Sequence, residues 1–196
     1  MIPADDLLDP ALVALARKGE VEAEAAFKLL YERYRDHVFA FLVRLVRDES
    51  LADDLLQETF LRVYRGLDRY HPERSFRAWV FQIARNAAID SLRSKKKDER
   101  LAQKSAERAT QDDPVSLVVT EVARREQVER ARAALEALPV EVRALLIQRH
   151  GLDMTLGELA ESHACTDRTV LTRLRAAVTL LARNMLAARD REGGRP

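Results

Sequence analysis

The segment from residue 75 to 97, SFRAWVFQIARNAAIDSLRSKKK, holds the side chains best suited to binding another molecule. Wound as a helix, it places an indole, two amides and an arginine on one side: Trp79, Gln82, Asn86 and Arg93. Between Arg77 and Lys97 there are six basic residues and one acidic residue. Cations hold phosphates, while aromatic rings and amides stack on unpaired bases or hydrogen-bond with them. Most basic helix ends are only solvated, but the neighbouring indole and amides favour a nucleic-acid interface.

Acidic residues gather in a different stretch. Residues 48–58 contain five acidic residues and no basic one, while the whole chain has a net charge of only +1. The chain is therefore not a nucleic-acid polycation, and its segregated charge suggests two kinds of partner, one basic and one anionic. Helical spacing predicts an outer side of this stretch that carries Asp54, Gln57, Glu58 and Leu61, with Asp53 at its margin. On charge alone, an ordinary solvated face is the simpler interpretation.

The composition argues against an enzyme or a metalloprotein. Cys165 is the only cysteine, so no intramolecular disulfide is possible. The four histidines show no metal-ligand spacing, and no glycine-rich phosphate loop or nucleophile elbow is present. We therefore expect no cofactor, no metal site and no catalysis. No signal peptide or apolar run of membrane-spanning length appears, so a cytoplasmic protein without membrane insertion is expected.

Periodicity and composition predict an all-α protein. Hydrophobic residues make up 47% and charged residues 33%, while glycine and proline number only six each, too few for a protein with many β-turns. Helices are predicted over 9–19, 21–47, 50–67 and 75–97. Their predicted starts are Asp9 as an N-cap before Pro10, Ser50 with Asp53 as a capping box, and Ser75 as an N-cap.

The second half of the chain is predicted to form a separate helical domain. Residues 98–114 lose apolar periodicity and are interpreted as a flexible linker that ends at Pro114. Further helices are predicted over 116–138, 140–150, 155–163 and 167–188, with Thr155 and Glu158 as a capping box. The predicted architecture is two helical domains, residues 9–97 and 115–188, joined by this linker.

Two stretches of the chain resemble region 2 of bacterial sigma factors of the sigma-70 family, extracytoplasmic-function group. They read ADDLLQETFLRVY and FRAWVFQIARNAAIDSLR, and a helix-turn-helix pattern near the C-terminus extends the resemblance. The order and spacing of these pieces make the resemblance specific, and together they cover roughly three quarters of the chain. It implies a protein that binds core RNA polymerase and directs it to promoters, without itself being an enzyme.

For the acidic helix, the resemblance implies a contact with the clamp helices of the polymerase β′ subunit. It changes the interpretation of this helix from a solvated face to a docking face, where apolar contact would give affinity and charge would give orientation. The implied polymerase-binding residues are Asp53, Asp54, Gln57, Glu58 and Leu61.

For the loop and the basic helix, the resemblance implies recognition of the −10 element and opening of the promoter. A pocket that receives a flipped base would recover part of the cost of melting, because stacking contributes about 1–3 kcal/mol per base. The loop from Tyr70 to Ser75 would form this pocket. The implied −10 contacts are Tyr70, Ser75, Trp79, Arg85, Asn86, Arg93, Lys95, Lys96 and Lys97.

The C-terminal helix pair has the length and turn of a helix-turn-helix, and the resemblance implies that its second helix reads the −35 element. The implied contacts are Arg168, Thr169, Thr172, Arg173 and Arg175. Leu171 and Ala176 stand where the family often has basic residues, so the −35 sequence cannot be transferred. The turn, His163-Ala164-Cys165, also lacks the glycine usual at this place. The helices around residues 138–149 would sit on the polymerase β flap.

Two alternatives remain open at this point. One is a free-standing helix-turn-helix regulator with a sensory N-terminal bundle, which would bind DNA without polymerase. The other is a helical adaptor without a DNA role, against which the basic and aromatic helix and the turn pattern both count. The family resemblance also implies an anti-sigma factor as a further partner.

Overall fold

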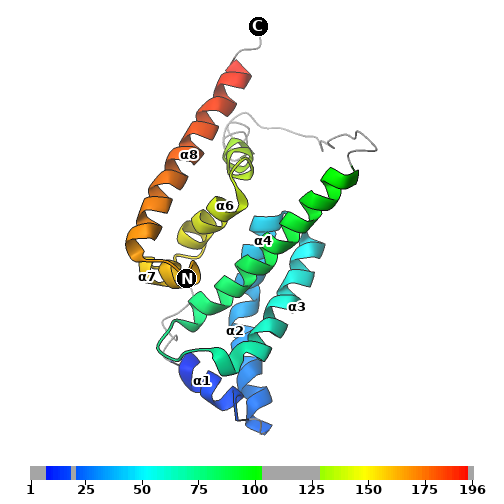
Figure 1. Ribbon diagram of the computed structural model, residues 1–196, viewed down its shortest axis with the longest axis vertical. Coiled ribbons are helices and arrows are strands. Elements are labelled where there is room, and N and C mark those ends of the chain that lie inside the picture. The colour runs from blue at the N-terminus through cyan, green and yellow to red at the C-terminus, as the bar shows by residue number, and fades with distance from the viewer. Residues whose placement is uncertain (1–7, 19–20, 103–128, 194–196) are drawn as a thin grey trace, which may run out of the picture.

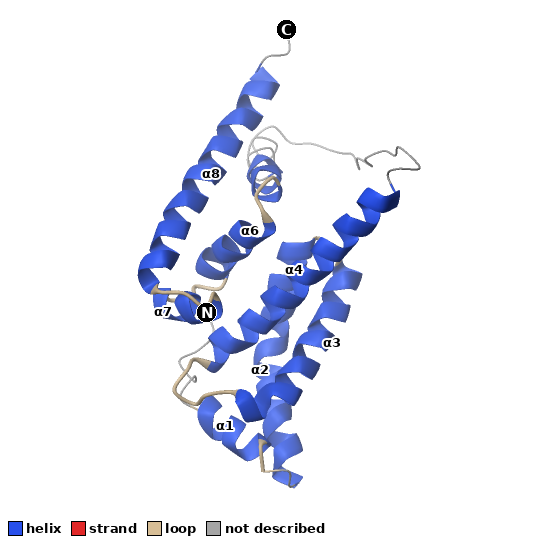
Figure 2. Ribbon diagram, in the orientation of Figure 1, coloured by secondary structure: helices blue, strands red, loops and turns tan. Residues whose placement is uncertain are grey.

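The computed structural model of this protein describes residues 8–18, 21–102 and 129–193. Every regular element in these ranges is a helix, which confirms the predicted all-α class. Figure 1 shows the helices in two groups, an N-terminal bundle of α1–α4 and a C-terminal bundle of α6–α8, lying side by side. Figure 2 shows the short loops that connect them.

Helix α2 (Val21–Val46) is the centre of the N-terminal bundle. It packs against α1 (Asp9–Ala16), α3 (Glu49–Gly66) and α4 (Phe76–Ala102), and a short 3-10 helix, η2 (Leu67–Arg69), follows α3. Aromatic rings fill the core. Phe41 of α2 meets Phe81 of α4 edge to face, with ring centroids 5.6 Å apart, and both side chains are fully buried. This core fixes the orientation of α4, which carries the predicted nucleic-acid face.

The start of α1 differs from the prediction, because Asp9 is not its N-cap. The helix begins at Asp9 after Leu8, which makes no side-chain capping hydrogen bond. The Asp9 carboxylate is instead buried, and it accepts a hydrogen bond from Arg33 at 2.5 Å and another from the Tyr34 hydroxyl. A buried carboxylate requires such partners, so α2 determines the position of Asp9.

The predicted capping box at the start of α3 is also wrong. The N-cap is Asp48, whose Oδ1 accepts a hydrogen bond from the Leu51 backbone N–H at 3.0 Å. Arg47 adopts a left-handed backbone with φ 62°, which ends α2 abruptly. The next helix therefore begins at Glu49, earlier than the pattern around Ser50 predicts.

Two other predicted helix starts are confirmed. The Ser75 hydroxyl accepts a hydrogen bond from the Ala78 N–H at 3.2 Å and so caps α4. In the capping box of α7 (Leu156–Ser162), Thr155 accepts from the Glu158 N–H, and the Glu158 carboxylate accepts from the Thr155 N–H.

The C-terminal bundle contains α6 (Val140–Leu146), a π-helical turn labelled η3 (Ile147–Gly151), α7 and α8 (Asp167–Gly193), preceded by helical residues 129–136. The two helices of the helix-turn-helix pattern contribute fully buried side chains to the core, among them Leu159 of α7 and Val170 of α8. The tight turn between them is also present. Ala164 adopts a left-handed backbone there, with φ 48°.

The two bundles share one apolar core, and α4 packs directly against α7. Helix α4 also continues to Ala102, past the predicted domain end at residue 97. Residues 103–114 of the predicted linker, and the predicted helix start at 116, lie outside the described residues. The division at 97 and 115 therefore stays a prediction, while contact between the bundles is a feature that the sequence patterns did not predict.

Candidate nucleic-acid and protein interfaces

The loop before α4 is built on a buried tyrosine. Tyr70 is 3% exposed, and its ring packs against Phe76 and Trp79 with centroid distances of 5.3 and 5.2 Å. Its hydroxyl donates to the Arg74 carbonyl at 2.5 Å. Burial, together with the charges of Asp9 and Glu161, raises the pKa of Tyr70 to about 12, so the hydroxyl remains protonated. In this state Tyr70 supports the loop rather than facing solvent.

Arg17 holds the same loop from α1, a contact for which the sequence carries no evident signal. Its guanidinium donates to the Leu67 carbonyl and to the Tyr70 carbonyl, and it lies 5.9 Å from the centre of the Tyr70 ring. The loop between α3 and α4 is therefore fixed by an arginine that lies 50 residues away from Leu67 in sequence.

Trp79, the predicted base-contacting indole, is half-buried at the end of this aromatic group. It lies against Gly66, where an added Cβ would come within 3.1 Å of the indole Cζ2. Because glycine has no side chain, the indole of Trp79 can pack closely against the end of α3. The indole keeps one exposed portion, and its role toward DNA stays a prediction.

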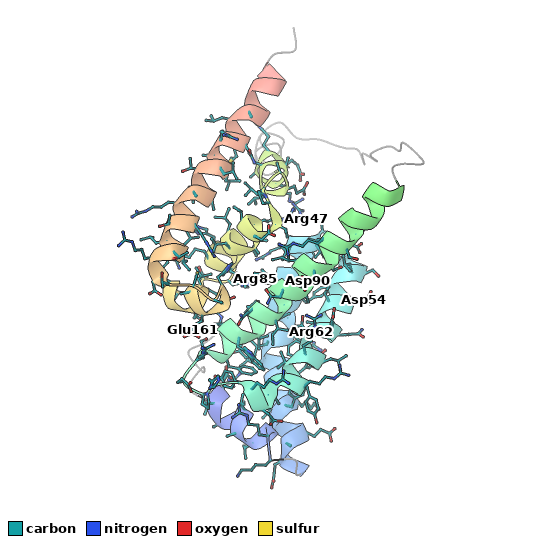
Figure 3. All side chains as sticks on the ribbon, viewed as in Figure 1. Arg47, Asp54, Arg62, Arg85, Asp90 and Glu161 are labelled. Carbon is teal, nitrogen blue, oxygen red and sulfur yellow. The ribbon has the colours of Figure 1, made fainter. Side chains whose placement is uncertain are left out.

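Two of the predicted basic residues of α4 lie toward the C-terminal bundle, Arg85 (Figure 3) and Arg93. Arg85 donates to the Asn86 side-chain oxygen at 3.0 Å, and Arg93 donates to Glu141 of α6 at 2.8 Å. Burial lowers the pKa of Arg85, with a further lowering from Arg173. Lys95 lies 3.9 Å from Asp48, while the side chains of Lys96 and Lys97 are outside the described residues.

Arg85, Asn86 and Arg93 line a cleft between the two bundles. The cleft has a volume of about 380 Å³, and its lining combines predicted −10 and −35 contacts: Arg85, Asn86, Arg93 and Arg173, with Glu141 and His163. Sequence reasoning placed these contacts on separate domains, whereas the structure brings them together.

Arg77 is the residue of α4 that sequence reasoning did not single out. It is buried, pairs with Glu158 of α7 at 3.1 Å and donates to the Leu152 carbonyl. Its Nε has no hydrogen-bond partner within the described residues. The sequence showed Arg77 only as one cation in a basic run, because its partners lie about 80 residues away.

The acidic face of α3 is open to solvent. The five predicted polymerase contacts, Asp53, Asp54, Gln57, Glu58 and Leu61, are all exposed. Glu58 pairs with Arg62 at 2.5 Å along the helix, and Leu61 is 54% exposed. Tyr64, one turn further on, is 58% exposed and stacks edge to face on Phe27. Tyr64 extends this mixed apolar and acidic surface, and its i+3 spacing from Leu61 could have indicated this from the sequence.

The first turns of α8 present the predicted −35 contacts. Arg168, Thr172, Arg173 and Arg175 are exposed, and Thr169 is half-buried. Thr172 donates to the Arg168 carbonyl, while the Arg173 guanidinium lies 3.8 Å from the Cys165 sulfur. Leu171 and Ala176, where basic residues were expected from the resemblance, are also exposed.

The buried side chain of Gln148 supports the turn before α8. Gln148 donates to the Ser162 hydroxyl at 3.1 Å, and its side-chain oxygen lies 2.7 Å from His163 Nε2. Burial, with added repulsion from Arg85 and Arg173, lowers the pKa of His163 to about 3. His163 is therefore neutral at physiological pH and donates to Gln148.

Neither a metal cluster nor a membrane helix is found in residues 8–18, 21–102 and 129–193. No three histidine, cysteine or acidic side chains there are grouped to hold a metal ion. None of the helices in these same ranges combines the length and apolar character needed to cross a bilayer.

Comparison with known proteins identifies the N-terminal bundle. Residues 30–98 match the family described as Sigma-70 region 2, which spans most of α2, all of α3 and most of α4. Over 169 residues the chain is 28% identical to ECF RNA polymerase sigma factor SigX of Bacillus subtilis (strain 168), covering 85% of this chain and 87% of SigX.

Two solved structures share the fold. CnrH, solved in complex with the cytosolic domain of CnrY, aligns with a TM-score of 0.63 at 23% identity over 91% of this chain and 97% of CnrH. The sigma factor RpoE of Bartonella quintana, solved with the anti-sigma factor NepR, gives 0.61 at 20% identity over 81% of this chain and 96% of RpoE. The region 2 match and the near full-length similarity to SigX agree. Residues 30–98 of this chain therefore form a sigma-70 region 2, and the chain as a whole resembles RNA polymerase sigma factors of the extracytoplasmic-function group.

Proposed function

We propose that this protein binds core RNA polymerase and directs it to a subset of promoters, and that it performs no catalysis of its own. The observation that carries this proposal is the match of residues 30–98 to sigma-70 region 2. The match includes both the exposed acidic face of α3 and the basic side of α4. A free-standing regulator would have no reason to carry this combination.

The acidic face of α3 is the proposed docking surface for the β′ clamp helices. Leu61 and Tyr64 offer apolar area at its centre, and Asp54 and Glu58 offer charge beside it. Charge at the border of an apolar contact orients a basic partner and excludes an acidic one. The flap of the β subunit is the proposed partner of the helices around residues 138–149.

The loop from Tyr70 to Ser75 and helix α4 form the proposed −10 surface. The buried Tyr70, fixed by Arg17, supplies a rigid base for the loop. Rigidity helps because a pocket that is already formed loses little entropy when it captures an unpaired base. The first turns of α8 form the proposed −35 surface.

A protein inhibitor of the anti-sigma class is a further proposed partner. RpoE of Bartonella quintana, which has the same fold, was solved with such a protein. An inhibitor that covered α3 or α4 would compete directly with polymerase or DNA.

The test is run-off transcription with purified core polymerase, using a library of promoter fragments from the source genome. We expect defined transcripts that require both polymerase and this chain. Transcription equal to that of core polymerase alone on every fragment would contradict the proposal. Binding of the isolated chain to a specific duplex with nanomolar affinity would instead favour a regulator.

A further inference from the structure

Arginine side chains from separate segments of the chain line one pocket at the end of α2. The pocket has a volume of about 450 Å³, and the charged residues of its lining are Arg44, Arg47, Arg132, Arg143 and Glu49. Figure 3 shows Arg47 at the end of α2, where it pairs with Glu136 at 2.7 Å. Four guanidinium groups around one pocket favour an anion inside it.

Two of the four arginines are neutralised by carboxylates of the chain itself. Arg47 pairs with Glu136, and Arg132 pairs with Glu129 at 3.0 Å. Among the residues that the structure describes, no carboxylate lies within ion-pair distance of Arg44 or Arg143, and the exposed Glu49 pairs with neither. These two arginines therefore give the pocket positive charge that the described part of the chain does not pair.

Arg143 of α6 is the more costly of the two cations. It is half-buried, and its Nε is buried without a hydrogen-bond partner in the described ranges. Burial lowers the pKa of Arg143; Glu136 opposes this effect and Arg47 adds to it. The guanidinium nevertheless stays charged, because arginine is not deprotonated in proteins. An anion in the pocket would reduce the electrostatic cost of keeping this charge partly out of water.

Arg44 is positioned by the π-helical turn η3. Its Nη1 donates to the Gly151 carbonyl at 3.4 Å. A Cβ added at Gly151 would come within 2.9 Å of the same nitrogen, so the missing side chain lets Arg44 lie against this turn. A guanidinium has five N–H donors in a fixed fork, and a single long hydrogen bond leaves most of them for a ligand.

Apolar side chains line the same pocket beside the arginines. Val43, Leu135 and Ile147 are half-buried and come from α2, from the helical residues 129–136 and from η3. Small-molecule sites have volumes of about 300–1,000 Å³ and combine apolar lining with a few polar groups. This lining suits a ligand that has an apolar ring as well as acidic groups.

We propose that this pocket binds a small molecule with two adjacent phosphate groups and a ring system, the chemistry of a nucleoside diphosphate. Guanidinium groups bind phosphate oxygens through parallel N–H donors, and the unpaired Arg44 and Arg143 are the main phosphate contacts. The ring lies on the apolar side chains of the pocket.

The site goes beyond the proposed function. None of the residues lining it is a predicted −10, −35 or α3 contact. Arg143 and Ile147 do belong to the stretch proposed to meet the β flap, so the binding experiments use the full chain without polymerase. Run-off transcription tests the proposed function separately, and either result can fail without the other.

The first test measures binding of GDP to the full chain by isothermal titration calorimetry at low salt. The variant Arg44→Gln/Arg143→Met removes the two unpaired charges. The matched control, Arg35→Gln/Arg183→Met, makes the same change in net charge on exposed arginines that do not line the pocket. We expect the variant to bind GDP at least about tenfold more weakly than the control, which corresponds to about 1.4 kcal/mol.

Equal affinity of the variant and the control would overturn the proposal, as would no binding of GDP by the wild type at millimolar concentration. If the double variant does not fold by circular dichroism, Arg44→Gln is compared with Arg35→Gln, because both side chains are exposed. The single variant is still expected to bind GDP more weakly than its control.

Further ligands separate the phosphate contact from the ring contact. Guanosine, which has no phosphate, should not bind, and pyrophosphate, which has no ring, should bind more weakly than GDP. Guanosine that bound as tightly as GDP would overturn the phosphate contact, and pyrophosphate that did so would overturn the ring contact. Mixed-sequence single-stranded DNA that displaced GDP would assign the arginines to nucleic acid and overturn the small-molecule site.

The second test changes the geometry of the pocket without changing its charge. Gly151→Ala places a methyl group against Arg44 Nη1, whereas a Cβ added at Gly157 of α7 has open space around it. Gly151→Ala should therefore bind GDP about threefold more weakly than the control Gly157→Ala, because Arg44 is displaced from its hydrogen bond. Equal affinity of these two variants would overturn the role of Arg44 in the site.

Discussion

At the scale of single residues, the turn between α7 and α8 contains a backbone conformation better suited to glycine. Ala164 has φ 48°, in the left-handed region where its Cβ approaches the following carbonyl oxygen. The absence of glycine here was visible in the sequence. The structure shows that Ala164 adopts the left-handed backbone that glycine would favour, so the backbone is strained at this alanine.

Ala164→Gly should therefore raise the free energy of unfolding by about 0.5–1 kcal/mol, because glycine relieves the strain at some cost in unfolded-state entropy. Urea denaturation followed by circular dichroism measures this change. Ala182→Gly, in the exposed middle of α8, is the control and should lower the stability by about 1 kcal/mol. A loss of stability at position 164 would show that its backbone is not left-handed.

His163 makes the stability of the protein depend on pH. Its folded-state pKa is about 3, whereas a histidine in an unfolded chain titrates near 6.5. Below pH 6.5 the unfolded chain binds a proton that the folded chain does not, so the free energy of unfolding falls as the pH falls toward 3. The slope from this one group is at most about 1.4 kcal/mol per pH unit.

The prediction is checked by denaturant unfolding at several pH values between 7.5 and 5, on the wild type and on His163→Gln. Glutamine cannot bind the proton but can still donate to Gln148. The variant should lose less stability on acidification than the wild type. Parallel pH profiles for the two proteins would rule out His163 as the titrating group.

At the scale of helices, α3 is expected to carry the main polymerase contact. Asp54→Lys with Glu58→Lys should abolish co-purification with core polymerase while leaving helicity unchanged, since both side chains are exposed. The control, Glu32→Lys with Asp36→Lys on α2, makes the same change in charge and should retain binding. Binding of polymerase by the α3 variant at the wild-type level would exclude this face.

Helix α8 is expected to read the upstream element through Arg173. Arg173→Ala should weaken transcription from a −35-dependent promoter by about 1–3 kcal/mol if the guanidinium reads a base. Arg183→Ala, on the same helix but beyond the proposed surface, serves as the control. An equal loss on promoters with and without a −35 match would indicate a phosphate contact instead.

Most helices could be predicted from the sequence, because the apolar spacing that defines them is local. The start of α4 at Ser75 and the capping box at Thr155 depend on hydrogen bonds between residues three positions apart. Asp9 was misinterpreted because its partners, Arg33 and Tyr34, lie on the next helix. A capping pattern shows that a polar side chain can accept a hydrogen bond from a nearby backbone N–H group. It does not show whether an arginine distant in sequence will bind that side chain instead.

At the scale of the whole molecule, the isolated chain should bind duplex DNA weakly and with strong salt dependence. Its net charge is +1, and two cations of α4, Arg77 and Arg93, are paired with Glu158 and Glu141. With core polymerase, binding should become tight and promoter-specific. Titrations at physiological salt, with and without polymerase, measure the difference. Nanomolar specific binding by the chain alone would contradict this expectation.

The relation between the two bundles was the part least accessible from the sequence. Charge patterns identified a basic side on α4 and a predicted reading surface on α8, and each lies on its helix as the periodicity indicates. Arg77 pairs with Glu158 across 81 positions of sequence, and no local pattern reports such a contact. The candidate contacts were therefore predicted from separate segments, whereas their common cleft could be found only in three dimensions.

The Arg77–Glu158 pair limits how freely halves of related sigma factors can be exchanged in protein engineering. A chimera that kept α4 but took its C-terminal half from a relative with an apolar residue at the position of Glu158 would leave a buried guanidinium without its carboxylate. Such a chimera would keep both predicted reading surfaces and would still fold poorly. In the design of such chimeras, Arg77 and Glu158 should therefore be transferred together as a pair.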